Sequence, residues 1–319
     1  MADFVYNVER MQPFFLVGPT AVGKSAVASE LAGRLAAEIV SADSMQVYRG
    51  MDIGTAKPGA AERSLVPHHL IDVCDINEPF DVKRFVDLAN QTIRDIEARK
   101  KTALVVGGTG LYVRALRHGL FEGPPRNAEL RARLERQSAP ELFDELQRLD
   151  PVTARRIDRH NPRRLVRALE VFYQTGKPIR KLQTQWDADS TRRGAPAIGL
   201  TRERTDLAER IDRRIDDQMA AGWVDEVRRL LPIGLEKNAT AMQAAGYREL
   251  VAHVRGGLSI AEAVALIKTR TRQLAKRQLT WFRREPQLHW VEIGRGERPS
   301  ETVARVCDVL HEQEKSSTR

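Results

Sequence analysis

A glycine-containing turn between an apolar run and a helical stretch carries the most specific chemical signal in the sequence. Residues 14–35 read FFLVGPTAVGKSAVASELAGRL, and Gly18 to Ser25 match the phosphate-binding pattern G-x-x-x-x-G-K-[ST] in its strand-to-helix context. Backbone N–H groups of such a loop, together with the positive end of the following helix, bind anionic oxygens. Lys24 is expected to reach the terminal phosphate, and the Ser25 hydroxyl to face Mg²⁺. A plain glycine turn is the alternative, but the complete pattern favours a phosphate site.

Two further apolar runs lead into residues that can do chemistry. Asp43 follows AEIVSA (37–42), so its carboxylate is expected at the same sheet edge as the phosphate loop, where it could accept a proton, orient Mg²⁺ or contact an acceptor. Capping of a short turn is the alternative role for Asp43. The run ALVVGG (103–108) leads to Thr109, whose hydroxyl could bind a phosphate or a base. No acid follows this run, which counts against nucleotide hydrolysis.

Two basic, amphipathic stretches point to a polyanionic partner. The stretch 161–181, NPRRLVRALEVFYQTGKPIRK, contains six Lys and Arg residues and one acid. The stretch 269–285, TRTRQLAKRQLTWFRRE, contains six Lys and Arg residues with two aromatic residues near its end. A helix with one apolar and one cationic face suits a phosphate backbone, although a solvated charged face is the alternative for either stretch alone. Arg210 and Arg214, one helical turn apart, could face a diphosphate or pair with aspartates of their own helix.

The order of the predicted elements favours an α/β fold. Short β-rich runs are separated by helical patterns such as the amphipathic stretch 81–101. This alternation predicts a P-loop NTPase-like, mostly parallel sheet flanked by helices on both faces. Ligands of such sheets bind beyond the carboxyl ends of the strands. The predicted strands are 14–17, 37–42, 68–73, 103–108, 195–200 and 289–293.

The alternation stops after about residue 119, which indicates an inserted helical domain. Helical periodicity and turn signals continue to about residue 194 without a convincing strand, and ordinary crossover helices are the alternative. The predicted organisation is a first core part (1–120), an all-helical insertion (121–194), a second core part with basic C-terminal helices (195–313) and a frayed tail (314–319).

Composition narrows the class of protein. Of the 319 residues, 42% are hydrophobic and 30% charged, which is typical of a soluble globular chain. No apolar run reaches the roughly 18 residues of a membrane span, and the first residues lack the apolar segment of a secretory signal. The excess of 52 Lys and Arg over 43 Asp and Glu favours an anionic partner. Two cysteines without metal-ligand spacing fit a reduced cytoplasm, and His68 and His69 are interpreted as structural.

Six motifs taken together are more specific than any one of them. In chain order they are GPTAVGKS, SADSMQVYRGMDIGTAKP, VGGTGLYVRAL, NPRRLVRALEVFYQTGKPI, AAGYRE and KRQLTWFRRE. Between about residues 14 and 285 the sequence therefore resembles the bacterial tRNA dimethylallyltransferases. The resemblance implies that the loop at Gly18 binds dimethylallyl diphosphate instead of ATP.

The resemblance also implies roles for individual residues. Asp43 is implied as the general base, with Thr20, Lys24 and Arg214 as further catalytic residues. The implied diphosphate-binding residues are Gly18, Pro19, Thr20, Ala21, Val22, Gly23, Lys24 and Ser25, with Mg²⁺ at Ser25. The implied tRNA-binding residues are Asp43, Ser44, Met45, Gln46, Thr109, Arg131, Arg163, Arg164, Leu165, Val166, Arg167, Gln243, Ala244, Ala245, Gly246, Tyr247, Arg248, Lys276, Arg277, Gln278, Leu279, Thr280, Trp281, Phe282 and Arg283.

The activity that the resemblance implies is transfer of a dimethylallyl group to the N6 amine of the adenosine 3′-adjacent to the anticodon, tRNA position 37, with release of diphosphate. The implied partners are dimethylallyl diphosphate, Mg²⁺ and the anticodon stem-loop of tRNA, which the helical insertion is expected to bind. A monomer in the cytoplasm, without membrane contact, is expected. From the residues alone, a P-loop small-molecule or nucleoside kinase and an RNA-binding ATPase remain alternatives, and the missing acid after residue 108 weakens both.

Overall fold

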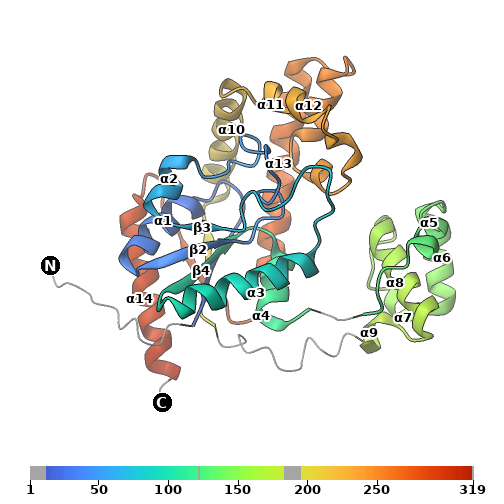
Figure 1. Ribbon diagram of the computed structural model, residues 1–319, viewed down its shortest axis with the longest axis horizontal. Coiled ribbons are helices and arrows are strands. Elements are labelled where there is room, and N and C mark those ends of the chain that lie inside the picture. Colours follow the sequence, from blue (N-terminus) through green and yellow to red (C-terminus); the bar gives the residue numbers. More distant parts are fainter. Residues whose placement is uncertain (1–11, 121–122, 183–194, 318–319) are drawn as a thin grey trace. The chain divides into compact units, whose positions relative to one another are not determined.

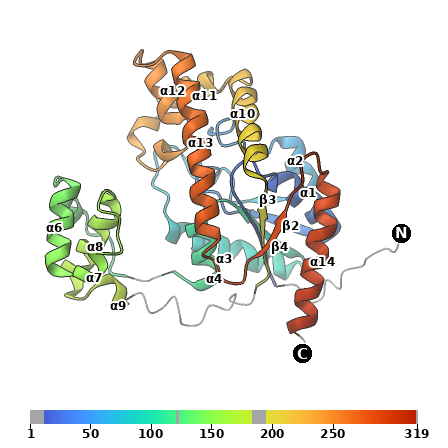
Figure 2. The same cartoon turned by 180° about the vertical axis from the view of Figure 1, so that it is seen from behind.

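The chain folds into two compact units. The computed structural model describes residues 12–120, 123–182 and 195–317. One unit, called the core unit here, combines Met1–Arg117 with Gly194–Arg319, and the other, the helical unit, is His118–Arg193 (Figures 1 and 2). The helical unit is thus a continuous insertion in the core unit, whereas the predicted boundaries at 121 and 194 lie outside the described residues.

The core unit is built on a parallel sheet with six strands among the described residues. The strand order is β3-β2-β4-β1-β5-β6, and every neighbouring pair is parallel. Because both faces of such a sheet are covered, its central strands are continuous apolar runs, as in the fully buried FFLV of β1. The predicted α/β fold class is confirmed. The strands are β1 (Phe14–Val17), β2 (Ala37–Ser41), β3 (His68–His69), β4 (Thr102–Gly107), β5 (Ala197–Thr201) and β6 (His289–Glu292).

Right-handed crossovers distribute the helices over both faces of the sheet. Helix α1 (Lys24–Arg34) connects β1 to β2, and α3 (Val82–Ala98) connects β3 to β4 in the opposite direction across the sheet. Such crossovers are right-handed, so the two helices cover opposite faces. Helix α14 (Pro299–Ser317) packs against α1 and covers the same face as that helix. Helix α4 (Gly110–His118) follows β4, and the short α2 (Ala60–Leu65) precedes β3.

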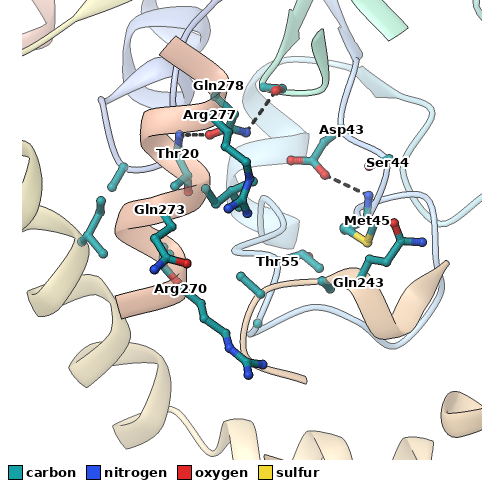
Figure 3. A pocket seen from close by; sticks show the side chains of 18 of the residues that line it. Thr20, Asp43, Ser44, Met45, Thr55, Gln243, Arg270, Gln273, Arg277 and Gln278 are labelled. Carbon is teal, nitrogen blue, oxygen red and sulfur yellow. Dashed lines mark hydrogen bonds between the residues drawn. The ribbon is translucent and has the colours of Figure 1, made fainter. Parts of the chain in front are cut away.

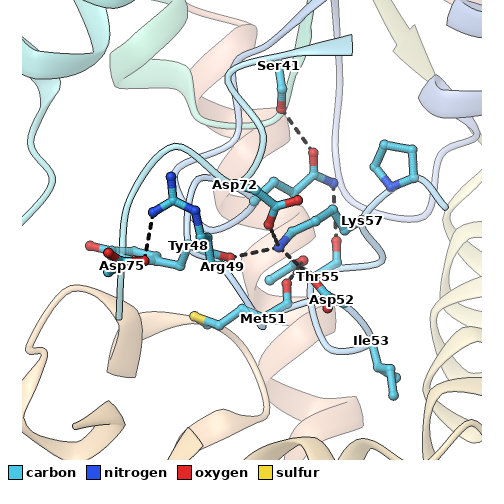
Figure 4. Close-up of polar contacts among 12 residues, drawn as sticks. Ser41, Tyr48, Arg49, Met51, Asp52, Ile53, Thr55, Lys57, Asp72 and Asp75 are labelled. Atoms are coloured by element: carbon cyan, nitrogen blue, oxygen red, sulfur yellow. Dashed lines mark hydrogen bonds and ion pairs between the residues drawn. The ribbon is translucent and has the colours of Figure 1, made fainter. Parts of the chain in front are cut away.

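The third strand is much shorter than the predicted 68–73. Only His68 and His69 pair with β2. Leu70 and Asp72 have φ values of 62° and 58°, which are incompatible with an extended strand. The chain therefore turns after His69, and Asp72 becomes a partner of Lys57 instead of a strand residue (Figure 4).

The two adjacent histidines have structural partners, as the sequence interpretation expected. Nδ1 of His68 lies 2.7 Å from the Val66 carbonyl, and Nε2 of His69 lies 2.7 Å from the carboxylate of Glu38. Burial raises the pKa of Glu38, but hydrogen bonds from Arg99, His69 and a nearby lysine outweigh burial and lower it to about 2. The cluster anchors the start of β2.

A second group of helices follows β5. They pack on one another in the order of the chain, and α13 contacts both α10 and α12 (Figure 1). Ser259 begins α13 with a capping box, since its hydroxyl accepts from the Glu262 amide and the Glu262 carboxylate accepts from the Ser259 amide. The bounds are α10 (Arg204–Ala220), α11 (Trp223–Leu230), the 3₁₀ turns η3 (Leu235–Lys237) and η4 (Ala241–Gln243), α12 (Tyr247–Val254) and α13 (Ile260–Phe282).

The helical unit has a separate hydrophobic core. No strand occurs among its described residues, 123–182. Asn127, Ser138, Asp150 and Asn161 each cap a helix by accepting a backbone amide hydrogen bond. The core is formed by Leu134, Leu142, Leu146, Ala154, Leu165, Val166, Ala168 and Leu169. The helices are α5 (Ala128–Leu134), α6 (Ala139–Leu149), α7 (Pro151–Ala154), α8 (Pro162–Thr175) and α9 (Ile179–Leu182).

The last helix extends beyond the predicted end of the core at 313. Helix α14 continues to Ser317, so residues 314–317 are helical and not a frayed tail. The sequence EQEK at 312–315 consists of good helix formers, which explains the extension. Residues 318–319 of the predicted tail lie outside the described residues. Within the described ranges, no helix is both long and apolar enough to cross a membrane.

Candidate active site

The phosphate-binding pattern forms the predicted loop between β1 and α1. Helix α1 begins at Lys24, and its N-cap Gly23 has a φ of 112°, a left-handed conformation that side chains disfavour. The ammonium of Lys24 donates a hydrogen bond to the Pro19 carbonyl at 2.7 Å. Ser25 is exposed in the first turn of α1. The loop thus presents a helix N-terminus and a lysine at the carboxyl end of the central strand, where anions bind.

Lys24 has an unusual proton affinity for a lysine. Burial lowers the pKa of its ammonium from 10.5 to about 7; the negative charge of Asp43 opposes this effect, and the positive charge of Arg214 adds to it. The group therefore changes charge near neutral pH. An anionic ligand in the loop would favour the charged form, so ligand binding and protonation of Lys24 are linked.

Asp43 follows the end of β2 and lines the same pocket as Thr20 and Ala21 of the phosphate-binding loop. Its Oδ1 accepts a hydrogen bond from the Met45 amide at 2.9 Å, which is the turn-capping role considered from the sequence. Its other oxygen accepts no hydrogen bond from the described residues, and Figure 3 shows it directed toward the side on which Arg277 lies. Electrostatic interactions connect Asp43 with Lys24 and Arg214. One oxygen of the Asp43 carboxylate therefore caps the turn, and the other is available to accept a hydrogen bond or a proton from a ligand.

Thr109 holds the Asp43 loop in place. Its hydroxyl accepts from the Ser44 amide at 3.0 Å and donates to the Ser44 hydroxyl at 3.2 Å. The Thr109 amide donates to the Ala42 carbonyl at 3.3 Å. These bonds join the carboxyl ends of β2 and β4, so Thr109 positions the residues on both sides of Asp43.

Helix α13 packs directly on the strand ends. Gln278 accepts a hydrogen bond from the Thr20 amide at 2.8 Å and donates to the Gly108 carbonyl at 3.0 Å (Figure 3). A Cβ atom on Gly110 would lie 2.2 Å from the Trp281 ring, so this close approach requires glycine. The basic stretch predicted at 269–285 therefore forms one wall of the site.

Two arginines of α10 contact the loops at the carboxyl ends of the strands. Arg210 donates to the Ala21 carbonyl at 3.0 Å, and Arg214 reaches the Thr55 carbonyl at 3.5 Å. The alternative, pairing within the helix, is wrong for the neighbouring acids: Asp212 and Asp216 pair with Arg272 and Lys268 of α13. Burial lowers the pKa of Arg214, and the negative charge of Asp43 opposes this effect.

A loop at residues 52–55 forms the opposite wall and was not predicted as part of the site. The buried carboxylate of Glu226 accepts the amides of Asp52, Ile53 and Gly54 at 2.8, 2.6 and 3.2 Å. It also accepts the Tyr247 hydroxyl at 2.6 Å. All four hydrogen bonds end on one side chain, so Glu226 fixes the backbone that lines the pocket.

Lys57 holds the same loop from its other side. The Lys57 side chain is 1% exposed, and its ammonium donates to the Tyr48 carbonyl at 2.7 Å and to Asp52 and Asp72 at 2.6 Å each (Figure 4). The side-chain oxygen of Gln46, a residue predicted to bind tRNA, accepts a hydrogen bond from the Ser41 hydroxyl at 3.0 Å. This network makes the loop a rigid wall before any ligand binds.

These elements enclose a pocket of about 680 Å³ in the core unit. The pocket brings together predicted diphosphate-binding, catalytic and tRNA-binding residues. Those that line it are Thr20, Ala21, Asp43, Ser44, Met45, Thr109, Arg214, Gln243, Ala244, Ala245, Arg248, Arg277, Gln278 and Trp281. Lining residues that the sequence prediction missed are Gly54, Thr55, Gly108, Gly110, Ile211, Ile215, Gln218, Trp223, Met242, Glu249, Arg270, Thr271, Gln273 and Leu274.

Several residues assigned to tRNA binding have buried side chains. Leu165 and Val166 belong to the core of the helical unit, and Tyr247 and Phe282 to that of the core unit. Their side chains cannot contact a nucleic acid directly, because packing removes them from the surface. Exposed members of the same group are Arg163, Arg164, Gln243, Arg248, Lys276, Arg277, Thr280 and Arg283.

Comparisons with known proteins show the family of the chain. A protein-family model described as IPP transferase matches residues 46–285, three quarters of the chain. The chain belongs to the IPP transferase family. Among curated IPP transferases, tRNA dimethylallyltransferase 1 of Pelobacter propionicus is 47% identical over 87% of this chain and 91% of its own. The tRNA dimethylallyltransferase of Geobacter metallireducens is 47% identical over 89% and 93%.

Solved IPP transferase structures share the fold. The full-length tRNA isopentenylpyrophosphate transferase of Bacillus halodurans is 38% identical, covers 97% of this chain and 100% of its own, and superposes with a TM-score of 0.71. A eukaryotic dimethylallyltransferase described as acting on tRNA is 26% identical, covers 89% and 74%, and gives a TM-score of 0.76. The family resemblance inferred from the six motifs is confirmed.

Proposed function

We propose that this protein is a tRNA dimethylallyltransferase that transfers the dimethylallyl group of dimethylallyl diphosphate to the N6 amine of adenosine 37. The observation that carries the proposal is the presence of Asp43 and residues of the phosphate-binding loop in one pocket, with Lys24 and Arg214 close enough for the negative charge of Asp43 to act on them. A base and an anion site side by side suit a reaction in which a nucleophile loses a proton while a phosphorylated group leaves.

The reaction replaces an N–H bond and a C–O bond with a C–N bond and an O–H bond. The N6 nitrogen bonds to C1 of the dimethylallyl group, and the C1–O bond to diphosphate breaks with its electron pair remaining on oxygen. The adenine amine is a poor nucleophile because its lone pair is delocalised, so acceptance of its proton by Asp43 assists the attack. The Asp43 oxygen that accepts no hydrogen bond from the described residues is the proposed proton acceptor.

The loop and its cations stabilise the leaving diphosphate. Lys24, Arg210 and Arg214 supply positive charge beside the loop amides. The exposed hydroxyl of Ser25, whose oxygen is a hard donor, suits Mg²⁺, and diphosphate oxygens would complete the coordination. When bound, Mg²⁺ supplies further charge neutralisation to the leaving group.

The acceptor base has to leave its stack to enter the pocket, at a cost of a few kcal/mol. Contacts between cationic side chains and the RNA backbone offset this cost. We propose that exposed residues of α13, among them Lys276 and Arg277, and the arginines of the helical unit provide these contacts. Because tRNA is the acceptor, we also propose that the enzyme acts in the cytoplasm, as a monomer.

The kinase and ATPase alternatives have little support. Strand β4 ends at Gly107, and the residues that follow it are Gly108 and Thr109. Neither is an acid that could hold a nucleotide-bound metal ion. The curated relatives carry the name of a transferase.

The direct test is incubation with dimethylallyl diphosphate, Mg²⁺ and unmodified tRNA in the absence of ATP, followed by mass analysis of the nucleosides. We expect one adenosine per tRNA to gain a C₅H₈ increment. Omission of Mg²⁺ and the substitution Ser25→Ala test the metal role, and both should slow transfer. Transfer that requires ATP, or no transfer to any tRNA, would reject the proposal.

A further inference from the structure

Glu170 of α8 is a completely buried carboxylate in the helical unit that bonds to two arginines. Its side chain is 0% exposed. Oε1 accepts the Asn127 amide at 3.0 Å and Nε of Arg131 at 2.9 Å, while Oε2 accepts Nη2 of Arg131 at 2.9 Å and Nη1 of Arg167 at 2.7 Å. Burial alone would raise the pKa of Glu170, but these hydrogen bonds hold it below its ordinary value. The carboxylate is therefore charged and fully hydrogen-bonded.

The two arginines remain partly accessible. The Arg131 side chain is 23% exposed and the Arg167 side chain 30% exposed. Arg167 also donates to the Pro124 carbonyl at 3.2 Å, which fixes a second edge of its guanidinium. One carboxylate and two guanidinium groups leave this cluster with a charge of +1 at the surface. Arg164, one helical turn before Arg167, is exposed on the same helix.

We propose that Glu170 is a positioning residue for RNA binding, which fixes Arg131 and Arg167 as an adjacent pair whose outer edges bind phosphodiester oxygens of the tRNA backbone. This inference rests on the proposed function, because it takes tRNA as the ligand. Glu170 itself does not touch the RNA. Its role is to hold two guanidinium groups close together against their mutual repulsion, so that two phosphate contacts form without loss of side-chain freedom on binding.

Positioning by Glu170 and simple electrostatics predict opposite effects of the substitution Glu170→Gln on the affinity for tRNA. Glu170→Gln removes a negative charge, so attraction alone would strengthen binding of tRNA. If positioning matters, binding weakens, because the amide NH₂ of glutamine cannot accept the donors of both arginines. Glu129→Gln is the matched control: it makes the same charge change in the same unit, on an exposed residue of α5 for which the described residues provide no hydrogen bond or ion pair.

The experiment measures the Kd of unmodified tRNA for the full-length protein between 50 and 200 mM salt. We expect Glu170→Gln to raise the Kd about tenfold at 0.15 M salt and to reduce the slope of log K against log salt by about 1.4, the value for two lost phosphate contacts on a single strand. The KM for dimethylallyl diphosphate should stay that of the unaltered protein. Glu129→Gln should leave the Kd unchanged or lower it slightly. An unchanged or tighter Kd for Glu170→Gln would overturn the proposal.

A second variant keeps the test decisive if Glu170→Gln does not fold, which thermal unfolding would reveal. Arg131→Lys preserves charge but loses the two-point contact with Glu170, so we expect the Kd to rise about threefold to tenfold. Equal affinity of Arg131→Lys and the unaltered protein would overturn the proposal. Transfer by the unaltered protein tests the proposed function separately, since it does not depend on either variant.

Discussion

The amide nitrogen of Thr20 lies 2.8 Å from the side-chain oxygen of Gln278, a residue 258 positions later in the sequence. The nitrogen of the same Gln278 side chain donates to the Gly108 carbonyl. Helix α13 is thereby joined to the phosphate loop after β1 and to the end of β4. On this helix Arg277 lines the pocket and the next residue back, Lys276, is exposed outside it, so the wall of the donor site and a basic surface belong to one helix.

Gln278→Ala removes both hydrogen bonds and leaves the Thr20 amide without its partner. We expect kcat/KM for the donor diphosphate to fall about tenfold, because the loop loses part of its preorganisation. Steady-state kinetics with saturating tRNA would measure this. The matched control is Gln273→Ala, on the same helix and in the same pocket, where the described residues offer the side chain no hydrogen bond. Equal kinetics for the two variants would contradict the assigned role of Gln278.

Asp43→Asn tests the proton acceptor. Asparagine retains a side-chain oxygen for the Met45 amide, so the turn is preserved while basicity is lost. We expect turnover to fall by about 10²–10⁴-fold with diphosphate binding retained. Single-turnover transfer and pyrophosphate binding by calorimetry give the two quantities. Undiminished turnover would mean that Asp43 only caps its turn.

We expect the side chain of Lys24 to take up a proton when diphosphate binds. Its pKa is about 7 in the free protein, so the ammonium is mostly deprotonated at pH 8, and bound anionic oxygens raise the pKa and draw a proton in. Affinity for diphosphate should therefore fall as pH rises through about 7. Calorimetry at pH 8 in buffers of different ionisation enthalpy should give close to one proton more for the unaltered protein than for Lys24→Met. Subtracting the proton uptake of Lys24→Met from that of the unaltered protein removes the protons that diphosphate itself exchanges. Equal proton uptake by the two proteins would mean that the pKa of Lys24 lies far from neutrality.

Glu226→Gln tests the support of the 52–55 loop. Glutamine presents an NH₂ group to a site that contains only donors, namely three backbone amides and the Tyr247 hydroxyl. We expect the free energy of unfolding to fall by about 2–4 kcal/mol, measured by urea denaturation. Glu236→Gln is the control, because Glu236 pairs with Arg255 at the surface and should cost less than about 1 kcal/mol. A Glu226 variant as stable as this control would show that the loop does not need the carboxylate.

Much of the core unit could be predicted because its signals are local. Each buried strand is a short apolar run, and the loop pattern at Gly18 occurs where β1 meets α1. Strand β3 was predicted too long because the apolar pattern of 68–73 gives no sign of the positive φ values at Leu70 and Asp72. Those conformations depend on tertiary partners of the turn, which pattern analysis does not include.

The placement of the charged residues was predicted better than that of the residues that support them. Asp43 and Lys24 belong to recognised motifs, Arg214 was singled out by its spacing from Arg210, and in the structure the charge of Asp43 acts on both cations. Glu226 and Gln218 belong to no motif, and the backbone groups of residues 52–54 that they bind lie more than 160 positions away. A glutamate in an amphipathic helix normally faces solvent, so only the fold reveals that Glu226 is buried.

The position of the insertion affects how the chain folds during synthesis. Strand β1 lies between β4 and β5, but about 90 residues separate the end of β4 at Gly107 from the start of β5 at Ala197. At a ribosomal speed of about 5–20 residues per second, β1 therefore waits roughly 5–20 s with one edge uncovered. A nascent chain in this state exposes the apolar edge of FFLV to other nascent chains.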